Sequence, residues 1–218
     1  MTSNEKIVEL IARHVLQEGE QVVRVKNWPD GVAVTTTVLR HLVAGSEQAA
    51  WTISREPWVD DVVIAERDDL IVEGQPQRFG FLLLDDGTDI YLNDPAAVSE
   101  LGRRLPDEMD PSGYAEILVA FHPHTSAHCA VLTESDELRR DLGRPDLPDV
   151  DPIRLQQAPD GVRLTFSSFA RYRLVGPQEL LDLLAWTVDV PAGEPARWTS
   201  RPTVTGLRLD PAGGVPHA

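Results

Sequence analysis

Three of the six histidines in this chain fall within one short segment, at His122, His124 and His128. Imidazole is the commonest protein ligand for zinc and similar divalent metals, and three histidines leave a fourth position open for water. If residues 115–121 and 128–132 form a hairpin, His122 and His128 lie near each other across its mouth. The segment then predicts a metal or acid-base site, with an activated water as the reacting group.

A simpler interpretation of the same segment is a polar hairpin tip with solvated histidines. Tips of this kind lie at the surface, and a metal-binding histidine usually has a carboxylate or carbonyl partner that orients its ring. Glu134 is the only evident carboxylate nearby in the sequence. We therefore expect no cofactor, and we keep zinc or a similar divalent metal at 122–128 as the alternative.

A second candidate surface involves two tryptophans and an arginine. Trp28 and Trp58 each adjoin a proline, and Arg55 precedes Trp58 by three residues. Tryptophans at element ends line clefts or mark partner surfaces, because the ring is large and the indole N–H is polar. Packing also explains each tryptophan and is the simpler explanation. Trp28, Arg55 and Trp58 are nevertheless the place where we expect a ligand or partner surface.

The sequence holds no motif that names a reaction. A P-loop, a dinucleotide-binding fingerprint and a G-x-S-x-G nucleophile elbow are all missing from the 218 residues. Whether the chain is an enzyme is therefore left open.

Charge and composition limit the classes of partner. The chain has 35 acidic and 20 basic residues, a formal charge of −15. This excess opposes binding to nucleic acid and to anionic membranes. It fits either a solubilising surface or a docking face for another protein with a basic surface. The single cysteine, Cys129, and the lack of a signal-like start or a long apolar run predict a cytoplasmic protein.

The first part of the chain alternates helix and strand signals. A capping box at Thr2 to Glu5 and apolar residues at helical spacing predict a helix over 3–18. Short β-branched runs separated by turn residues predict strands, notably hairpins at 21–39 and 78–92. A second helix is expected over 95–105, and the apolar run Ile117 to Phe121 is expected to be a central strand.

The second part begins after a segment rich in proline and aspartate. We predict an N-terminal lobe over 1–143, a connection over 144–152, a C-terminal lobe over 153–209 and a flexible tail over 210–218. The C-terminal lobe should contain a hairpin at 153–169, and the leucine-rich stretch 177–189 should be a deeply packed helix.

These signals predict an α+β fold. One antiparallel or mixed β-sheet would be covered by three main helices, at 3–18, 95–105 and 177–189, and the chain would form two lobes. For function we expect a non-catalytic binding or accessory protein acting through a protein-protein surface. A small enzyme or ligand-binding protein using the histidines at 122–128 is the alternative.

Overall fold

The computed structural model contains both helices and strands, and strands dominate. It describes residues 3–16, 18–28, 31–37, 48–55, 62–72, 75–84, 88–105, 107–122, 128–134, 136–173 and 178–209. None of the helices in these ranges is both long and apolar enough to cross a lipid bilayer. The chain divides into two compact units, Met1–Ala97 and Val98–Ala218. The predicted connection at 144–152 lies within the second unit.

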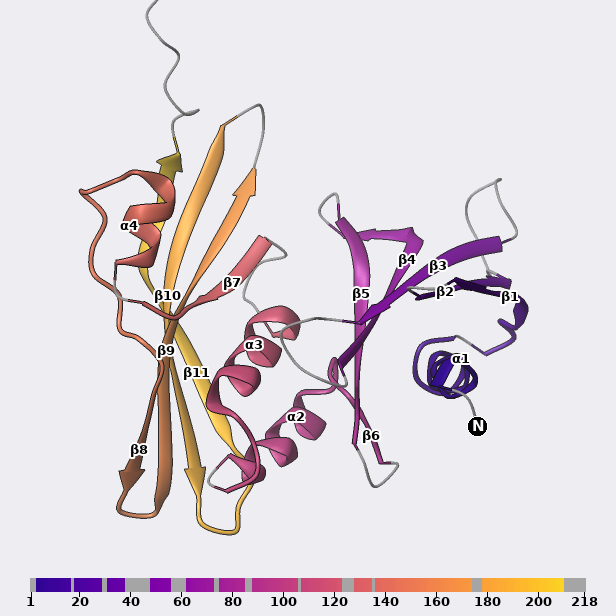
Figure 1. Cartoon of the computed structure of the whole chain (residues 1–218), viewed down its shortest axis with the longest axis horizontal. Coiled ribbons are helices and arrows are strands. Elements are labelled where there is room, and N and C mark those ends of the chain that lie inside the picture. The colour runs from indigo at the N-terminus through magenta and orange to yellow at the C-terminus, as the bar shows by residue number, and fades with distance from the viewer. Residues whose placement is uncertain are drawn as a thin grey trace, which may run out of the picture. The chain divides into compact units, whose positions relative to one another are not determined.

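The first unit is a helix followed by an antiparallel meander in which each strand pairs with the next (Figure 1). Its elements are α1 (Ser3–His14), β1 (Val22–Trp28), β2 (Gly31–Thr37), β3 (Gln48–Arg55), β4 (Val62–Val72), β5 (Gln75–Leu83) and β6 (Asp89–Tyr91). Ile7, Leu10 and Ile11 of α1 are buried against one face of the sheet. The predicted N-terminal helix and the two early hairpins are thereby confirmed.

The second unit is built on a separate antiparallel sheet. Its elements are α2 (Pro95–Leu101), the 3₁₀ turn η1 (Gly102–Arg104), α3 (Pro111–Phe121), β7 (His128–Leu132), α4 (Glu137–Leu142), β8 (Arg154–Ala158), β9 (Gly161–Arg173), β10 (Glu179–Pro191) and β11 (Arg197–Leu209). The strand order is β11-β10-β9-β7, and β8 pairs with the other half of the same edge of β9.

The predicted α+β fold, with one sheet covered by three main helices, is therefore wrong. The protein is mostly β, and the strand pairs within the described residues are antiparallel. The largest error is 177–189, which was expected to be a helix and is β10 between β9 and β11. Its apolar residues spread over both faces because the first half of β10 is buried on both sides. Leu184, Trp186 and Val188 lie on one face, and Leu181 and Leu183 on the other.

The run Ile117 to Phe121 is also not a strand. It is the last part of α3, whose start carries two helix signals. The Asp110 side chain accepts a hydrogen bond from the backbone N–H of Gly113 at 3.1 Å, and Pro111 occupies the first turn. Both features favour a helix N-terminus. They lie seven and six residues before the apolar run, which by itself does not distinguish a buried helix from a buried strand.

Helices cover the two faces of the second sheet unequally. On one face, α3 packs beside β7 and β9, and Phe166 stacks on Trp186 with ring centroids 5.5 Å apart. On the other face, Leu138 of α4 packs with Leu147 and Val150 against Leu181 and Leu183. In Figure 1, α4 and α3 lie on opposite sides of this sheet. The α4 layer reaches only one half of its face.

The segment after α4 is held against the sheet by ionic contacts as well as by Leu147 and Val150. Arg144 donates two hydrogen bonds to the Asp146 carboxylate, at 2.7 and 2.6 Å, and a third to the backbone carbonyl of Arg208 at 3.2 Å. The Arg144 hydrogen bond lowers the pKa of Asp146 to about 2. Arg139 also pairs with Asp149. The proline- and aspartate-rich stretch is thus an ordered cover for half of one sheet face.

A close contact joins α2 and η1 to the turn between β10 and β11. The backbone N–H of Ala196 donates to the Ser99 carbonyl at 2.8 Å, and the Ser99 hydroxyl donates to the Ala196 carbonyl at 2.5 Å. Tyr114 of α3 donates to the Val98 carbonyl at 2.9 Å, and burial raises the pKa of this phenol. A Cβ atom at Gly102 would lie 2.7 Å from the Tyr114 hydroxyl and would also meet the Ala196 methyl group.

We therefore expect Gly102→Ala to destabilise the protein by about 1–3 kcal/mol, because the added methyl overpacks this junction. Urea unfolding followed by circular dichroism measures the loss. Ala196→Gly in the same chain removes the opposing methyl and should restore part of it. A Gly102→Ala variant as stable as the wild type would contradict the close packing.

The start of α4 is fixed by one carboxylate. Glu137 Oε2 accepts hydrogen bonds from the Thr133 N–H at 2.7 Å, the Thr133 hydroxyl at 3.0 Å and the Glu134 N–H at 3.2 Å. Partial burial tends to raise the pKa of Glu137, but these hydrogen bonds and nearby Arg140 together lower it below the ordinary 4.5. The carboxylate form therefore stabilises the fold.

This stabilisation is complete above the ordinary pKa and is lost as the pH falls through the lowered pKa. At pH 7, we expect Glu137→Gln to cost roughly 0.5–1 kcal/mol. Urea unfolding at pH 7 and at about pH 3 should show the difference from the wild type shrinking on acidification. An equal difference at both pH values would mean that the charge of Glu137 does not contribute.

Candidate functional site

The register of the second sheet separates its residues into an apolar and a polar face. Along β9, Val162, Leu164 and Phe166 are buried, whereas Arg163 is exposed and Thr165 is half-buried. Successive side chains of a strand point to opposite faces, and paired residues of neighbouring strands point to the same face. Arg163 and Thr165 therefore lie on the face opposite α3, in the half beyond the α4 layer.

Three rows of paired residues extend this polar surface across the sheet. The first row is Gln156, Arg163, Asp189 and Arg197, the second is Arg154, Thr165, Thr187 and Thr199, and the third contains Ala185 and Arg201. We call this set of ten residues the open face. It contains four arginines and one aspartate, although acidic residues exceed basic ones by 35 to 20 in the whole chain.

The arginines of the open face differ in their partners. Arg163 donates to Asp189 at 2.6 Å, and Arg197 pairs with Glu194 of the adjoining turn at 2.6 Å. Arg154 and Arg201 are exposed, and neither forms an ion pair with any residue that the structure describes. Two guanidinium groups at opposite sides of the open face are thus available to an external anion.

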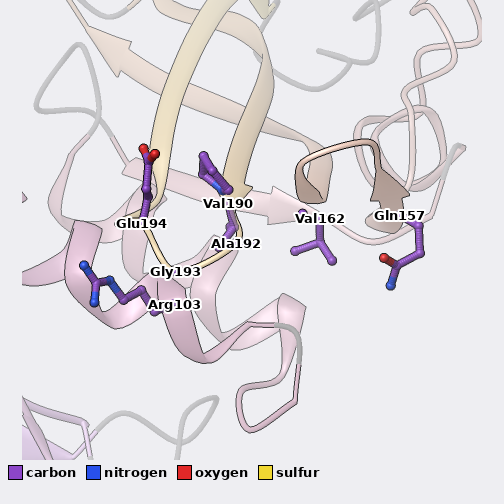
Figure 2. Close-up of a pocket in the computed structure, with 9 residues that line it drawn as sticks. Arg103, Gln157, Val162, Val190, Ala192, Gly193 and Glu194 are labelled. Carbon is purple, nitrogen blue, oxygen red and sulfur yellow. The ribbon is translucent and has the colours of Figure 1, made fainter.

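A hollow of about 230 Å³ lies at the hairpin-turn end of the same sheet. Figure 2 shows its lining side chains, with Arg103 contributed by η1 and the others by the ends of β8, β9 and β10 and by the turn between β10 and β11. The lining residues are Arg103, Gln157, Gly161, Val162, Val190, Pro191, Ala192, Gly193 and Glu194. Arg103 already pairs with Glu100, and Glu194 with Arg197. The lining holds no histidine, cysteine or hydroxyl group, and its one carboxylate, Glu194, is engaged by Arg197.

A second hollow, of about 400 Å³, borders α4. It is lined by Asp136, Arg139, Arg140, Gly143 and Pro145. Its charged groups pair with one another or with neighbours: Arg140 contacts Glu134 at 2.8 Å and Asp136 at 3.8 Å, and Arg139 pairs with Asp149. These ion pairs lie within and beside α4, and they engage each charged side chain of the lining.

The predicted histidine site is only partly within the described residues. His122 ends α3, and its ring lies against that of Trp198, with centroids 5.4 Å apart. His128 begins β7 and pairs with Arg171, and His124 lies outside the described residues. Across the described ranges, no three His, Cys, Asp or Glu side chains form a metal-binding group. Zinc binding at His122, His124 and His128 stays a prediction, although the hairpin that motivated it is replaced by a helix followed by a strand.

The predicted tryptophan surface is likewise untested. Trp28 ends β1 opposite Gly31, and Arg55 ends β3 opposite Val63. The register places both backbones at the same end of the first sheet with β2 between them, about 10 Å apart at ordinary strand spacing. Trp58 lies outside the described residues. A ligand or partner surface at Trp28, Arg55 and Trp58 stays a prediction.

Sequence analysis missed the arginines of the open face. A weak signal was present, because Arg197, Thr199 and Arg201 alternate with Trp198 and Ser200, as polar residues do on a half-exposed strand. The rows can be assigned only when β10 is known to be a strand, because its Asp189, Thr187 and Ala185 lie between the paired residues of β9 and β11.

Comparison with protein-family models, with curated proteins and with solved structures found no match.

If the open face is an interaction surface, its charges should contribute little to folding. We expect Arg154→Glu combined with Arg201→Glu to change the free energy of unfolding by no more than about 0.5 kcal/mol. Arg173→Glu with Arg208→Glu is the matched control, because both arginines are exposed near the other end of this sheet and the charge change is equal. Denaturant unfolding compares the two. A large loss confined to the first variant would assign Arg154 and Arg201 a structural role.

Proposed function

We propose that the chain is a non-catalytic binding protein and that its partner, another protein, docks on the open face. The observation that carries this proposal is the surface formed by β8, β9, β10 and β11, on which four arginines surround a row of threonines. A surface of charged and hydroxyl groups on a sheet is suited to recognition, because the strands hold its groups in fixed positions.

The chemistry of the two hollows supports binding over catalysis. In the first hollow, Arg103 pairs with Glu100 and Glu194 pairs with Arg197. In the second hollow, Arg140 pairs with Glu134. The buried hydroxyl of Ser168, which lies in the core of the second sheet, accepts a hydrogen bond from the Trp186 indole at 2.8 Å. Its role is therefore to satisfy the indole N–H, as expected for a buried tryptophan.

The open face also changes the expected charge of the partner. The net charge of −15 favoured a partner with a basic surface. At the open face, basic side chains outnumber acidic ones. A docking partner senses mainly these local charges, because salt screens charges that lie more than about 8 Å away. The cytoplasm remains the proposed compartment, on the basis of the single cysteine, Cys129.

A bulky uncharged substitution on the open face tests the proposal. Thr187 occupies the centre of the threonine row, and tyrosine is favourable in strands. We expect Thr187→Tyr to abolish or strongly reduce capture of a partner that the wild-type protein retains from extracts of its native host. Quantitative mass spectrometry of the captured proteins provides the measurement.

Thr205→Tyr is the control, because Thr205 is exposed on β11 outside the open face. Circular dichroism should show that both variants are folded. If the two variants and the wild type capture the same proteins in equal amounts, the open face is not the docking surface.

A further inference from the structure

We infer that the occupant of the open face is a short, extended, acidic protein segment that lies across the strands and pairs with Arg154 and Arg201. This inference rests on the proposed function and specifies the chemistry of the partner. Its three supports are the unequal engagement of the four arginines, the spacing of the two exposed ones, and the size of the surface.

The first support is the difference between engaged and available guanidinium groups. Asp189 and Glu194 already neutralise Arg163 and Arg197. Arg154 and Arg201 form no ion pair within the described residues and are exposed. A guanidinium group matches a carboxylate through two parallel N–H donors, so these positions favour a ligand that presents two carboxylates.

The second support is the distance between these two groups. Arg154 lies on β8 and Arg201 on β11, three strand spacings and one row apart. With about 4.8 Å between strands and about 6.8 Å between rows, their Cα atoms are roughly 16 Å apart. An extended chain advances about 3.4 Å per residue. Side chains an even number of residues apart point to the same side of an extended chain, so two carboxylates separated by three intervening residues, about 13.6 Å apart, are the best match to the two arginines.

The threonine row lies between the two arginines. Thr165, Thr187 and Thr199 pair across three neighbouring strands on the path from Arg154 towards Arg201. Each hydroxyl can donate one hydrogen bond and accept two. These groups can therefore satisfy the backbone of a segment that crosses the sheet, while the arginines select its acidic side chains.

The third support is the limited size and composition of the open face. Its three rows and four strands measure roughly 14 Å by 14 Å. A long polyanion or a lipid surface would extend beyond it, over a chain whose formal charge is −15. The open face also presents no aromatic ring on which a base could stack. A short acidic protein segment fits these limits, whereas nucleic acid and membranes do not.

The test uses the full chain and a fluorescein-labelled peptide of ten residues. The peptide carries two glutamates separated by three serine or threonine residues, so that both point to the same side of an extended chain, and a second peptide carries glutamines in their place. Fluorescence anisotropy at 50 mM and 300 mM NaCl gives the dissociation constants. We expect the wild type to bind the glutamate peptide about tenfold or more tightly than the glutamine peptide at 50 mM NaCl, with weaker binding at 300 mM.

The two double variants separate the open face from general charge. Arg154→Glu with Arg201→Glu should weaken binding of the glutamate peptide about tenfold or more. Arg173→Glu with Arg208→Glu changes the net charge equally and should have less than about a twofold effect. Equal weakening by both variants, equal binding of the two peptides, or tighter binding of a ten-nucleotide oligothymidine would overturn the inference.

This outcome is distinguishable from failure of the proposed function. If Thr187→Tyr removes the captured partner but the glutamate peptide does not bind, the open face is a docking surface and the acidic segment is the wrong occupant. If Thr187→Tyr leaves capture unchanged, docking on the open face itself is wrong.

Discussion

The antiparallel pairing of β9 with β10 determines the structure of the second unit. The two strands pair without interruption from Gly161 opposite Pro191 to Arg173 opposite Glu179. This register assigns every residue of both strands to one of two faces. A shift of β9 by one residue would turn Leu164 and Phe166, which are buried, to the opposite face and would place Arg163 on the side of the core. The hydrophobic effect therefore specifies the register, and the register then positions the polar residues.

The open face results from unequal coverage of that ladder. The α2 and α3 side is covered where Trp186 and Phe166 stack, and the junction at Ser99, Gly102 and Ala196 holds the turn between β10 and β11 against the helices. On the other side, α4 and the following segment reach Leu181 and Leu183 but not Thr187 or Asp189. The strands of the second sheet extend beyond the α4 layer. On this face, the half under α4 carries leucine, and the uncovered half carries arginine and threonine.

Local charge at the open face opposes the charge of the whole chain. Arg154, Arg163, Arg197 and Arg201 come from three different strands and none is next to another in the sequence, so no basic run marks them. Exposed ion pairs such as Arg163–Asp189 contribute little to stability. Under the proposed docking role, such a pair holds a guanidinium group in a defined arrangement, which would lower the entropic cost of binding a partner.

The sequence alone determined the features that depend on local signals. The first helix follows from the spacing of Ile7, Leu10 and Ile11, and hairpins at 78–92 and 153–169 follow from turn residues, Asp-Asp-Gly and Pro-Asp-Gly, between segments with apolar residues. A local signal also explains Ile117 to Phe121, which is helical because Asp110 and Pro111 begin a helix upstream of the apolar run. Tertiary structure decided 177–189, which is a strand because β9 and β11 pair with its backbone on both sides. The candidate site could not be found from the sequence for the same reason. Its residues become neighbours only through pairing between strands, which depends on contacts between residues that are distant along the chain.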